Sequence, residues 1–210
     1  MRAARMAPPP APQTMKERIL ETADRLFYRQ GIRAVGVDTI AAEIGISKRT
    51  LYNHFPSKDA LIAAYLERRR AQPAPSAPPA SVTTALEQIL ATFETLERRF
   101  ASPDFRGCPF VNAVAEVGQE DRAVKSIAKA FKESRRLWFR DRLAQLGVTD
   151  AEALATQLVL LVDGAIAQDL VRDDPTMARA ARDAATVLLR NAGVDVTDGA
   201  KPVATRKPAP

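Results

Sequence analysis

The stretch IAAEIGISKRTLYNHFPSKDAL, residues 40–61, decides the fold of this chain. It holds two short segments whose apolar residues recur at helical spacing. Gly45 lies between them and can adopt the left-handed conformation that ends a helix, and Ser47 is a suitable N-cap for the second segment. Two short helices joined by a tight turn that contains glycine are typical of a helix-turn-helix.

The second of these helices is predicted to have two different faces. At about 100° per residue, Leu51 and Phe55 fall on one side, where they can pack against the preceding helices. The other side gathers two cations, a phenol and an amide, which are Lys48, Arg49, Tyr52 and Asn53. Such groups can bond phosphates or base edges, and the free amides behind Ser47 suit a phosphate. The alternative is an ordinary solvated helix face.

The rest of the chain is also predicted to be helical, which makes the fold all-α with about nine helices. Capping boxes are predicted at Thr14 with Glu17 and at Thr149 with Glu152, and Asp-Pro at 174–175 predicts another helix start. The predicted helices cover residues 14–30, 37–44, 47–55, 57–70, 81–100, 111–117, 123–146, 149–172 and 174–192.

The Pro-rich run AQPAPSAPPA marks the clearest internal break, because proline-rich sequence cannot form a helix. We therefore expect an N-terminal three-helix helix-turn-helix domain and a second helical domain. The predicted division is a disordered arm at 1–13, the first domain at 14–70, a Pro/Ala-rich linker at 71–80, the second domain at 81–193 and a disordered tail at 194–210.

Positive charge is concentrated in the first third of the chain. Residues 14–70 hold eleven Lys and Arg against seven Asp and Glu, whereas residues 71–194 hold fifteen against sixteen. A basic excess on the segment with the helix-turn-helix pattern indicates a polyanionic partner for that segment.

The chain has little equipment for enzyme chemistry. Its single histidine, His54, cannot build a multi-histidine metal site, and no glycine-rich phosphate loop is present, so we expect no enzyme, no metal and no cofactor. The single cysteine, Cys108, excludes an intrachain disulfide and fits a reducing cytoplasm. The most apolar run, residues 154–170, contains two aspartates and is expected to be too short and too charged to span a membrane.

Residues 13–70 resemble the DNA-binding domain of the TetR family of bacterial transcriptional regulators, and residues 40–61 follow the family pattern nearly position by position. The resemblance implies that the helix after Ser47 enters the major groove of double-stranded DNA. The residues implied to face DNA are Ser47, Lys48, Arg49, Thr50, Tyr52, His54 and Lys58. Among them, Arg49 and Thr50 are expected to read bases together with Asn53, and Tyr52, His54 and Lys58 to hold phosphates. Gly36 stands where the family often has a capping Ser or Thr, and Thr39 is the expected substitute.

The resemblance also implies that the second half binds a ligand and forms a homodimer. The candidate pocket combines aromatic residues with polar groups: Phe93, Phe110, Asn112, Glu116, Phe131, Arg135 and Trp138. Ordinary core packing is the alternative for the aromatics. The candidate dimer interface lies on the last two helices: Leu158, Leu161, Val162, Ala165, Ala181, Ala185 and Leu188. The alternative is that both helices are buried within one subunit.

These expectations combine into a hypothesis: a cytoplasmic, homodimeric repressor that binds a pseudo-palindromic operator and responds to a small-molecule inducer. Two alternatives stay open. One is a DNA-binding regulator without a small-molecule ligand, controlled by a protein partner or by the redox state of Cys108. The other is a helical enzyme with an incidental basic face, which the poor supply of catalytic residues disfavours.

Overall fold

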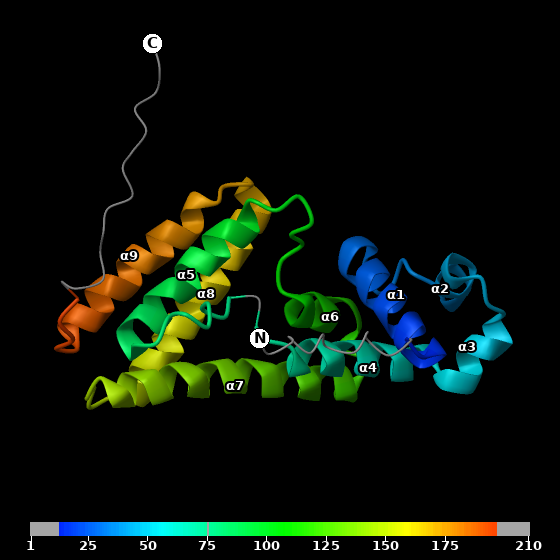
Figure 1. Ribbon diagram of the computed structural model, residues 1–210, viewed down its shortest axis with the longest axis horizontal. Coiled ribbons are helices and arrows are strands. Elements are labelled where there is room, and N and C mark those ends of the chain that lie inside the picture. Colours follow the sequence, from blue (N-terminus) through cyan, green and yellow to red (C-terminus); the bar gives the residue numbers. More distant parts are fainter. Residues whose placement is uncertain (1–12, 75, 197–210) are drawn as a thin grey trace, which may run out of the picture.

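A computed structural model describes residues 13–74 and 76–196, and all regular structure within these residues is helical (Figure 1). The all-α prediction is confirmed. The nine helices of the described part are α1 Met15–Gln30, α2 Val37–Ile44, α3 Lys48–His54, α4 Lys58–Ala71, α5 Ala85–Phe100, α6 Pro109–Val117, α7 Arg122–Gln145, α8 Ala151–Arg172 and α9 Thr176–Asn191. The arm and the tail predicted from the sequence fall mainly on residues 1–12 and 197–210, outside the described residues.

The signals at the ends of the first helices work as the sequence predicts. Thr14 and Glu17 form the capping box of α1, with the Thr14 side chain accepting from the Glu17 amide and Glu17 accepting from the Thr14 amide. Gly45 ends α2 in the left-handed conformation, with φ at 77°. Ser47 then caps α3, so the short turn of the motif is built from local interactions.

Three other helices begin a few residues away from their predicted starts. α5 begins at Ala85 rather than at 81, because Thr84 provides the cap by accepting from the Glu87 amide. α6 begins at Pro109 rather than at 111. α9 begins at Thr176, and the side chain of Asp174 accepts from the Thr176 amide.

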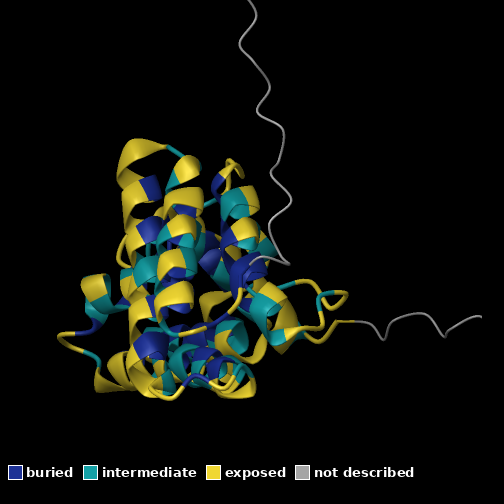
Figure 2. Ribbon diagram, turned by 90° about the vertical axis from the view of Figure 1, so that its left-hand side faces the viewer, coloured by how far each residue is buried: buried dark blue, intermediate teal, exposed yellow. Residues whose placement is uncertain are grey.

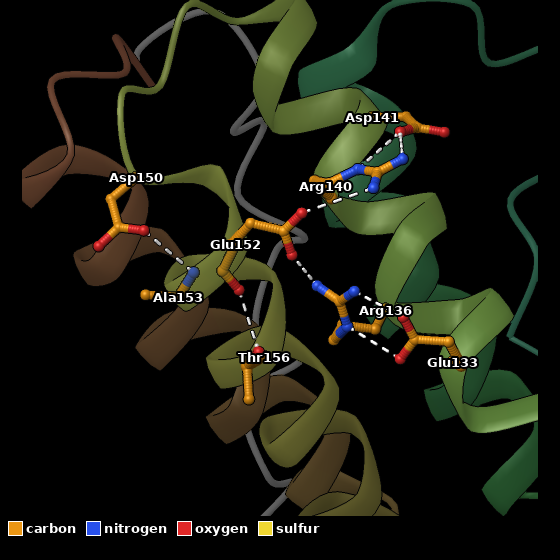
Figure 3. A network of polar contacts seen from close by, with 8 residues as sticks. All are labelled: Glu133, Arg136, Arg140, Asp141, Asp150, Glu152, Ala153 and Thr156. Atoms are coloured by element: carbon orange, nitrogen blue, oxygen red, sulfur yellow. Dashed lines mark hydrogen bonds and ion pairs between the residues drawn. The ribbon is translucent and has the colours of Figure 1, made fainter. Parts of the chain in front are cut away.

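The predicted capping box at Thr149 and Glu152 is wrong. Asp150 is the N-cap of α8, because its side chain accepts from the Ala153 amide at 3.2 Å (Figure 3). Glu152 instead turns toward α7, where its carboxylate pairs with Arg136 and, at 3.5 Å, with Arg140. A tertiary ion-pair network between α7 and α8 therefore takes the glutamate away from its local capping role.

The buried residues form two clusters. The first joins α1–α4 to α6 and α7, so the helix-turn-helix unit shares its core with part of the second half. The second lies between α5, α8, α9 and the C-terminal part of α7. In Figure 1, α1–α3 lie at one end of the molecule, α5, α8 and α9 stand at the other, and α7 runs along the base.

The Pro-rich segment after α4 is packed against the rest of the chain. Ala74 packs on the first core cluster, and Ser76 is only 5% exposed. The Ser76 hydroxyl accepts a hydrogen bond from Nη2 of Arg135 on α7 at 3.0 Å. The division into domains at 14–70 and 81–193 stays a prediction, but α4 and α7 are in direct contact across it.

α8 is the most apolar helix of the chain. With 22 residues it is long and apolar enough to cross a membrane by length and composition, so the sequence argument that it is too short was wrong. One face of α8 packs against α7 and α9, and five of its apolar residues belong to the second core cluster: Leu154, Ala155, Leu158, Val162 and Ala165. A core helix of a water-soluble protein has the same composition.

Candidate nucleic-acid interface and internal cavity

α3 is anchored by its apolar side. Leu51 and Phe55 are buried against α1 and α2, and the Thr50 amide donates to Oγ of Ser47 at 3.0 Å. The hydroxyls of Ser47 and Thr50 are also 2.8 Å apart. Lys48, Arg49, Tyr52, Asn53 and His54 are left exposed on the remaining surface of the helix, as the sequence predicts.

Arg49 is exposed on this face of α3. It makes no hydrogen bond or ion pair with any residue that the structure describes, and it lies in the first turn of α3. An exposed guanidinium with five donors in a planar fork can bond two acceptors of a base edge at once. The placement therefore fits the base-reading role implied by the resemblance.

Lys48 differs from Arg49 because it already has an anionic partner. Its Nζ lies 2.9 Å from a carboxylate oxygen of Asp38, in the first turn of α2. That hydrogen bond, with the charge of Asp38, raises the pKa of Lys48. Thr39, the neighbour of Asp38, is exposed in the same turn, where Gly36 provides no side-chain cap. A phosphate that contacts Lys48 must compete with Asp38.

Lys58 lies at the edge of the candidate interface and is half-buried in the first turn of α4. Burial lowers the pKa of Lys58, while the nearby carboxylate of Glu116 on α6 acts in the opposite direction. Glu116 also accepts from the amide of Arg33 at 2.8 Å, and Nε of Arg33 donates to the Glu116 carbonyl at 2.6 Å. The predicted phosphate contact therefore sits beside a junction between the two halves.

An internal cavity of about 40 Å³ lies between α7, α8 and the loop that precedes α6. Of the seven predicted pocket residues, Phe131 and Arg135 line it. The other lining residues are Ser76, Leu96, Phe105, Gly107, Cys108, Pro109, Lys132, Phe139, Val159, Val162, Asp163 and Ile166. Pockets for drug-sized ligands have volumes of about 300–1,000 Å³, so this cavity must expand to hold such a ligand.

Five predicted pocket residues lie outside the cavity wall. Phe93 is buried in the second core cluster, and Phe110 stacks behind the wall on Phe131 with ring centroids 3.9 Å apart. Asn112 donates to the carbonyl of Arg106, Glu116 binds Arg33 as described, and Trp138 carries arginine side chains over its ring. The ordinary-core alternative describes Phe93 and Phe110 better.

Sequence reasoning missed the wall residues on α8 and in the preceding loops. Val159, Val162, Asp163 and Ile166 recur at helical spacing, so they form one face of α8, but the same pattern fits any core face. Ser76 and Phe105 come from non-helical segments with no periodic signal. Their position depends on contacts between residues far apart in the chain.

The cavity contains three charged side chains. Nζ of Lys132 lies 2.5 Å from Oδ1 of Asp163, so these two charges form an ion pair between α7 and α8. Arg135 is half-buried one turn further along α7, and its Nη2 donates to Ser76. Burial lowers the pKa of Arg135 to about 10, although the charge of Asp163 opposes this shift.

Most of the predicted dimer-interface residues pack inside the chain. Leu161 and Leu188 are half-buried, and five others are buried in the second core cluster: Leu158, Val162, Ala165, Ala181 and Ala185. These five cannot offer area to a second copy, and Val162 also lines the cavity. Burial therefore argues against these five residues as contacts, and an interface on α8 and α9 stays a prediction for the outward faces of these helices.

The outward faces of α8 and α9 carry small and apolar residues. Leu160 is 65% exposed, Val171 is 83% exposed and Val187 on α9 is 53% exposed. Gly164 lies between the first two, and a Cβ added there would meet no atom within 4 Å. Figure 2 views the molecule from the side of Figure 1 on which α5, α8 and α9 lie, and there exposed residues alternate with buried ones along the helices. We call Leu160, Gly164, Val171 and Val187 the outer stripe.

Cys108 is the single cysteine of the chain. Cys108 is buried, precedes α6 and touches the cavity. Among the described residues, no group of three or more His, Cys, Asp and Glu side chains is placed to hold a metal ion.

Comparison with known families gives two matches that together cover most of the chain. Residues 19–65 match the family described as bacterial regulatory proteins, tetR family. Residues 85–187 match the C-terminal domain described as transcriptional regulator LmrA/YxaF-like. The first match covers the helix-turn-helix, and the second covers the whole outer stripe and every residue of the cavity wall except Ser76.

Solved structures show a similar fold over most of this chain. A TetR-type regulator of Streptomyces avermitilis is 34% identical, with a TM-score of 0.77, covering 87% of this chain and all of that one. A TetR-family regulator of Streptomyces coelicolor is 36% identical, with a TM-score of 0.74, covering 83% of this chain and 94% of that one. A transcriptional regulator of Saccharomonospora viridis, solved with choline, is 25% identical over 83% of this chain and 95% of its own, with a TM-score of 0.61.

Matches to some curated relatives are partial. The match to a regulator of Bacillus subtilis is 48% identical but covers only 18% of that protein, and the match to a regulator of Mycobacterium tuberculosis covers 61%.

Proposed function

Because this chain belongs to the TetR family of bacterial transcriptional regulators, and is a helix-turn-helix DNA-binding regulator and not an enzyme, we propose that it is a ligand-responsive repressor. In this proposal a homodimer binds a pseudo-palindromic operator in the cytoplasm, and a small molecule in the cavity releases it. The observation that carries the DNA-binding part is the exposed polar face of α3, with Arg49 unpaired and Leu51 holding the helix from behind.

The outer stripe supports the dimer. Exposed apolar residues with a glycine between them allow two helices to approach closely, and a two-fold axis brings the same faces of two copies together. The two recognition helices of such a dimer must lie about 34–36 Å apart to enter successive major grooves on one side of DNA. The operator is then expected to contain two inverted half-sites.

The cavity supports regulation by a small molecule. At about 40 Å³ it is small in this conformation, so a larger ligand binds only if α7, α8 or the loop before α6 moves. In this proposal the operator favours the form with the small cavity, and the ligand favours the expanded form. Each therefore weakens the binding of the other, and by the same factor. The choline bound to the regulator of Saccharomonospora viridis is a precedent for a small-molecule ligand in a related protein.

Selection of bound sequences from random duplex DNA tests the proposal. The expected result is enrichment of an inverted repeat whose half-sites are centred about one helical turn, or a multiple of it, apart. Failure to enrich any sequence would contradict specific binding, and enrichment of a single half-site would contradict the symmetric dimer. Fluorescence anisotropy with the selected operator then gives the affinity for use with candidate ligands.

Control by a protein partner or by oxidation of Cys108 is the second candidate. Cys108 is only 8% exposed, which limits the access of oxidants and argues against a redox role in this conformation. The matched variant is Cys108→Ala. If peroxide releases the wild type from its operator and leaves the variant bound, the redox alternative replaces the ligand-responsive mechanism.

A further inference from the structure

Arg135 is the cation of the cavity wall that forms no ion pair with the described residues, although the charge of Asp163 acts on it from a distance. Lys132 is neutralised by Asp163 at 2.5 Å, whereas the one hydrogen bond that Arg135 makes with the described residues goes to the neutral hydroxyl of Ser76. The three charged side chains that line the cavity thus leave one net positive charge. That charge belongs to Arg135, because the other two cancel.

The surroundings of Arg135 hold its guanidinium in place but do not neutralise it. Its guanidinium carbon lies 5.2 Å from the ring centroid of Trp138 and 5.8 Å from that of Phe139. Removing a cation from water is unfavourable unless a counter-charge or several hydrogen bonds replace the water. The unfavourable burial is relieved if an anion enters the cavity beside Arg135.

The remaining wall residues indicate which chemical groups the rest of such a ligand carries. Apart from the charged groups, the cavity is lined mainly by aliphatic and aromatic side chains, which are Leu96, Phe105, Phe131, Phe139, Val159, Val162 and Ile166. Apolar walls with one fixed cation select a molecule that has an apolar body and a single negative group.

We propose that Arg135 anchors the carboxylate of the effector, which is an amphipathic organic acid with a compact aromatic or aliphatic body. This inference rests on the proposed function and names its ligand class. A carboxylate can accept two hydrogen bonds from a guanidinium, and such a pair is stronger than the bond to a hydroxyl. A cation such as choline is disfavoured at this position.

The proposal includes a route from the ligand toward α4. The carboxylate must compete with Ser76 for the guanidinium, since Nη2 of Arg135 now holds the Ser76 hydroxyl. Ser76 lies five residues after Ala71, the last residue of α4. Release of Ser76 frees the segment that connects the DNA-binding unit to the rest of the chain.

The test measures binding to the full chain without DNA. Isothermal titration is performed with 2-naphthoate, 4-phenylbutyrate and decanoate, each beside its neutral primary amide, and with choline chloride. The expected result is that at least one acid binds at least tenfold more tightly than its amide, with choline showing no binding. If every acid binds no better than its amide, the proposal is wrong.

Two variants locate the effect at Arg135. Arg135→Gln should bring the acid-to-amide ratio close to one. Arg142→Gln is the matched control, because Arg142 also stacks on Trp138, at 4.4 Å, but does not line the cavity. The control should keep the wild-type ratio. Equal loss of the ratio in both variants would overturn the assignment to Arg135.

A third variant covers the case in which Arg135→Gln does not fold. Ser76→Ala removes the hydroxyl that competes with the ligand, so the acid should bind several-fold more tightly while its amide is unaffected. An unchanged or weakened affinity for the acid would contradict the competition. Operator binding without any compound is measured in parallel by anisotropy. If the wild type does not bind the operator, the proposed repressor function is wrong. If it binds the operator but binds every acid no better than its amide, only the proposed ligand class is wrong.

Discussion

The hydroxyl of Tyr28 on α1 donates a hydrogen bond to the carbonyl of Gly107 at 3.1 Å and accepts one from the amide of Arg106 at 3.0 Å. Gly107 lines the cavity, and the guanidinium carbon of Arg69 on α4 lies 4.7 Å from the centroid of the Tyr28 ring. A single side chain therefore contacts the cavity wall and α4, and it belongs to the helix that packs on α2. Movement of the wall can reach the DNA-binding unit through this residue.

Tyr28→Phe tests this connection, because it removes the two hydrogen bonds and keeps the ring. We expect a loss of stability of about 1–2 kcal/mol, since each hydrogen bond contributes about 1 kcal/mol. Operator affinity without ligand should stay within about twofold of the wild-type value. The factor by which a ligand weakens operator binding should fall by at least about fivefold, which is the lower end of common allosteric couplings. Anisotropy titrations with and without a binding carboxylate measure both values.

Arg29→Gln is the control for Tyr28→Phe. Arg29 also joins α1 to this loop, through an ion pair with Asp104 at 2.5 Å, but both side chains are at least half exposed. Exposed ion pairs contribute about 0–1 kcal/mol, so this variant should keep the wild-type response to ligand. Full coupling in Tyr28→Phe would show that the signal travels by another route.

Arg49→Ala tests base reading by α3. Because the Arg49 side chain is exposed and unpaired among the described residues, its loss should leave the fold intact. We expect the preference at one base pair of each half-site to relax by about 1–3 kcal/mol, with other positions unchanged. Competition binding across a library of single-base operator variants measures this. Arg49→Lys keeps the charge but not the planar fork, so it should lose the same preference while retaining more total affinity.

Leu160→Glu tests the outer stripe. Leu160 is 65% exposed, so the substitution should not disturb the subunit, but a carboxylate in an apolar interface has no counter-charge. We expect dimerisation to weaken by on the order of 2 kcal/mol or more, the scale of a central interface residue. Light scattering measures the mass, and anisotropy should show weaker operator binding.

Val111→Glu is the matched control for the dimer test. Val111 lies on α6, outside the two helices of the outer stripe, and is 50% exposed, so Val111→Glu makes the same chemical change on a different helix. This variant should remain dimeric. If Leu160→Glu dimerises with the same affinity as the wild type, the interface does not include Leu160 and the prediction is wrong.

Asp169 on α8 predicts a pH dependence of stability. It is 4% exposed, and its Oδ1 has no hydrogen-bond partner among the described residues. Burial, together with the charges of Asp173 and Asp174, raises the pKa of Asp169 above the ordinary value of 3.8. Between the pKa of the unfolded state and the higher pKa of the folded state, Asp169 is more protonated in the folded protein. The free energy of unfolding therefore decreases as pH rises through this window. The loss persists at neutral pH.

Asp169→Asn should remove this dependence. We expect the variant to be more stable than the wild type at pH 7 by about 1 kcal/mol or more, because the neutral amide places no charge in the buried site and desolvating a charged group costs more than desolvating a neutral one. The difference should shrink at acidic pH, where the wild-type carboxyl is protonated. Urea unfolding at several pH values measures it, and a constant difference across the range would show that charge is not the cause.

Sequence reasoning succeeded where the physical interaction is local. The capping box of Thr14 with Glu17 and the Gly45 turn involve residues within one helical turn of each other, so the interactions can be recognised from spacing. The same reasoning failed for Thr149 with Glu152, because Arg136 on α7 competes for the glutamate. The buried dimer candidates failed for a related reason: periodicity finds apolar residues but not the neighbour that covers them.

The sequence by itself determined the all-α class, the helix-turn-helix and the polar face of α3, since each follows from contacts over three or four residues. Only the tertiary structure decided the cavity wall, the unpaired charge of Arg135 and the junction at Tyr28. Ser76 and Arg135 are 59 residues apart, and Tyr28 and Gly107 are 79 residues apart. Such pairs meet only when the whole core packs, because no local pattern encodes the distance between them.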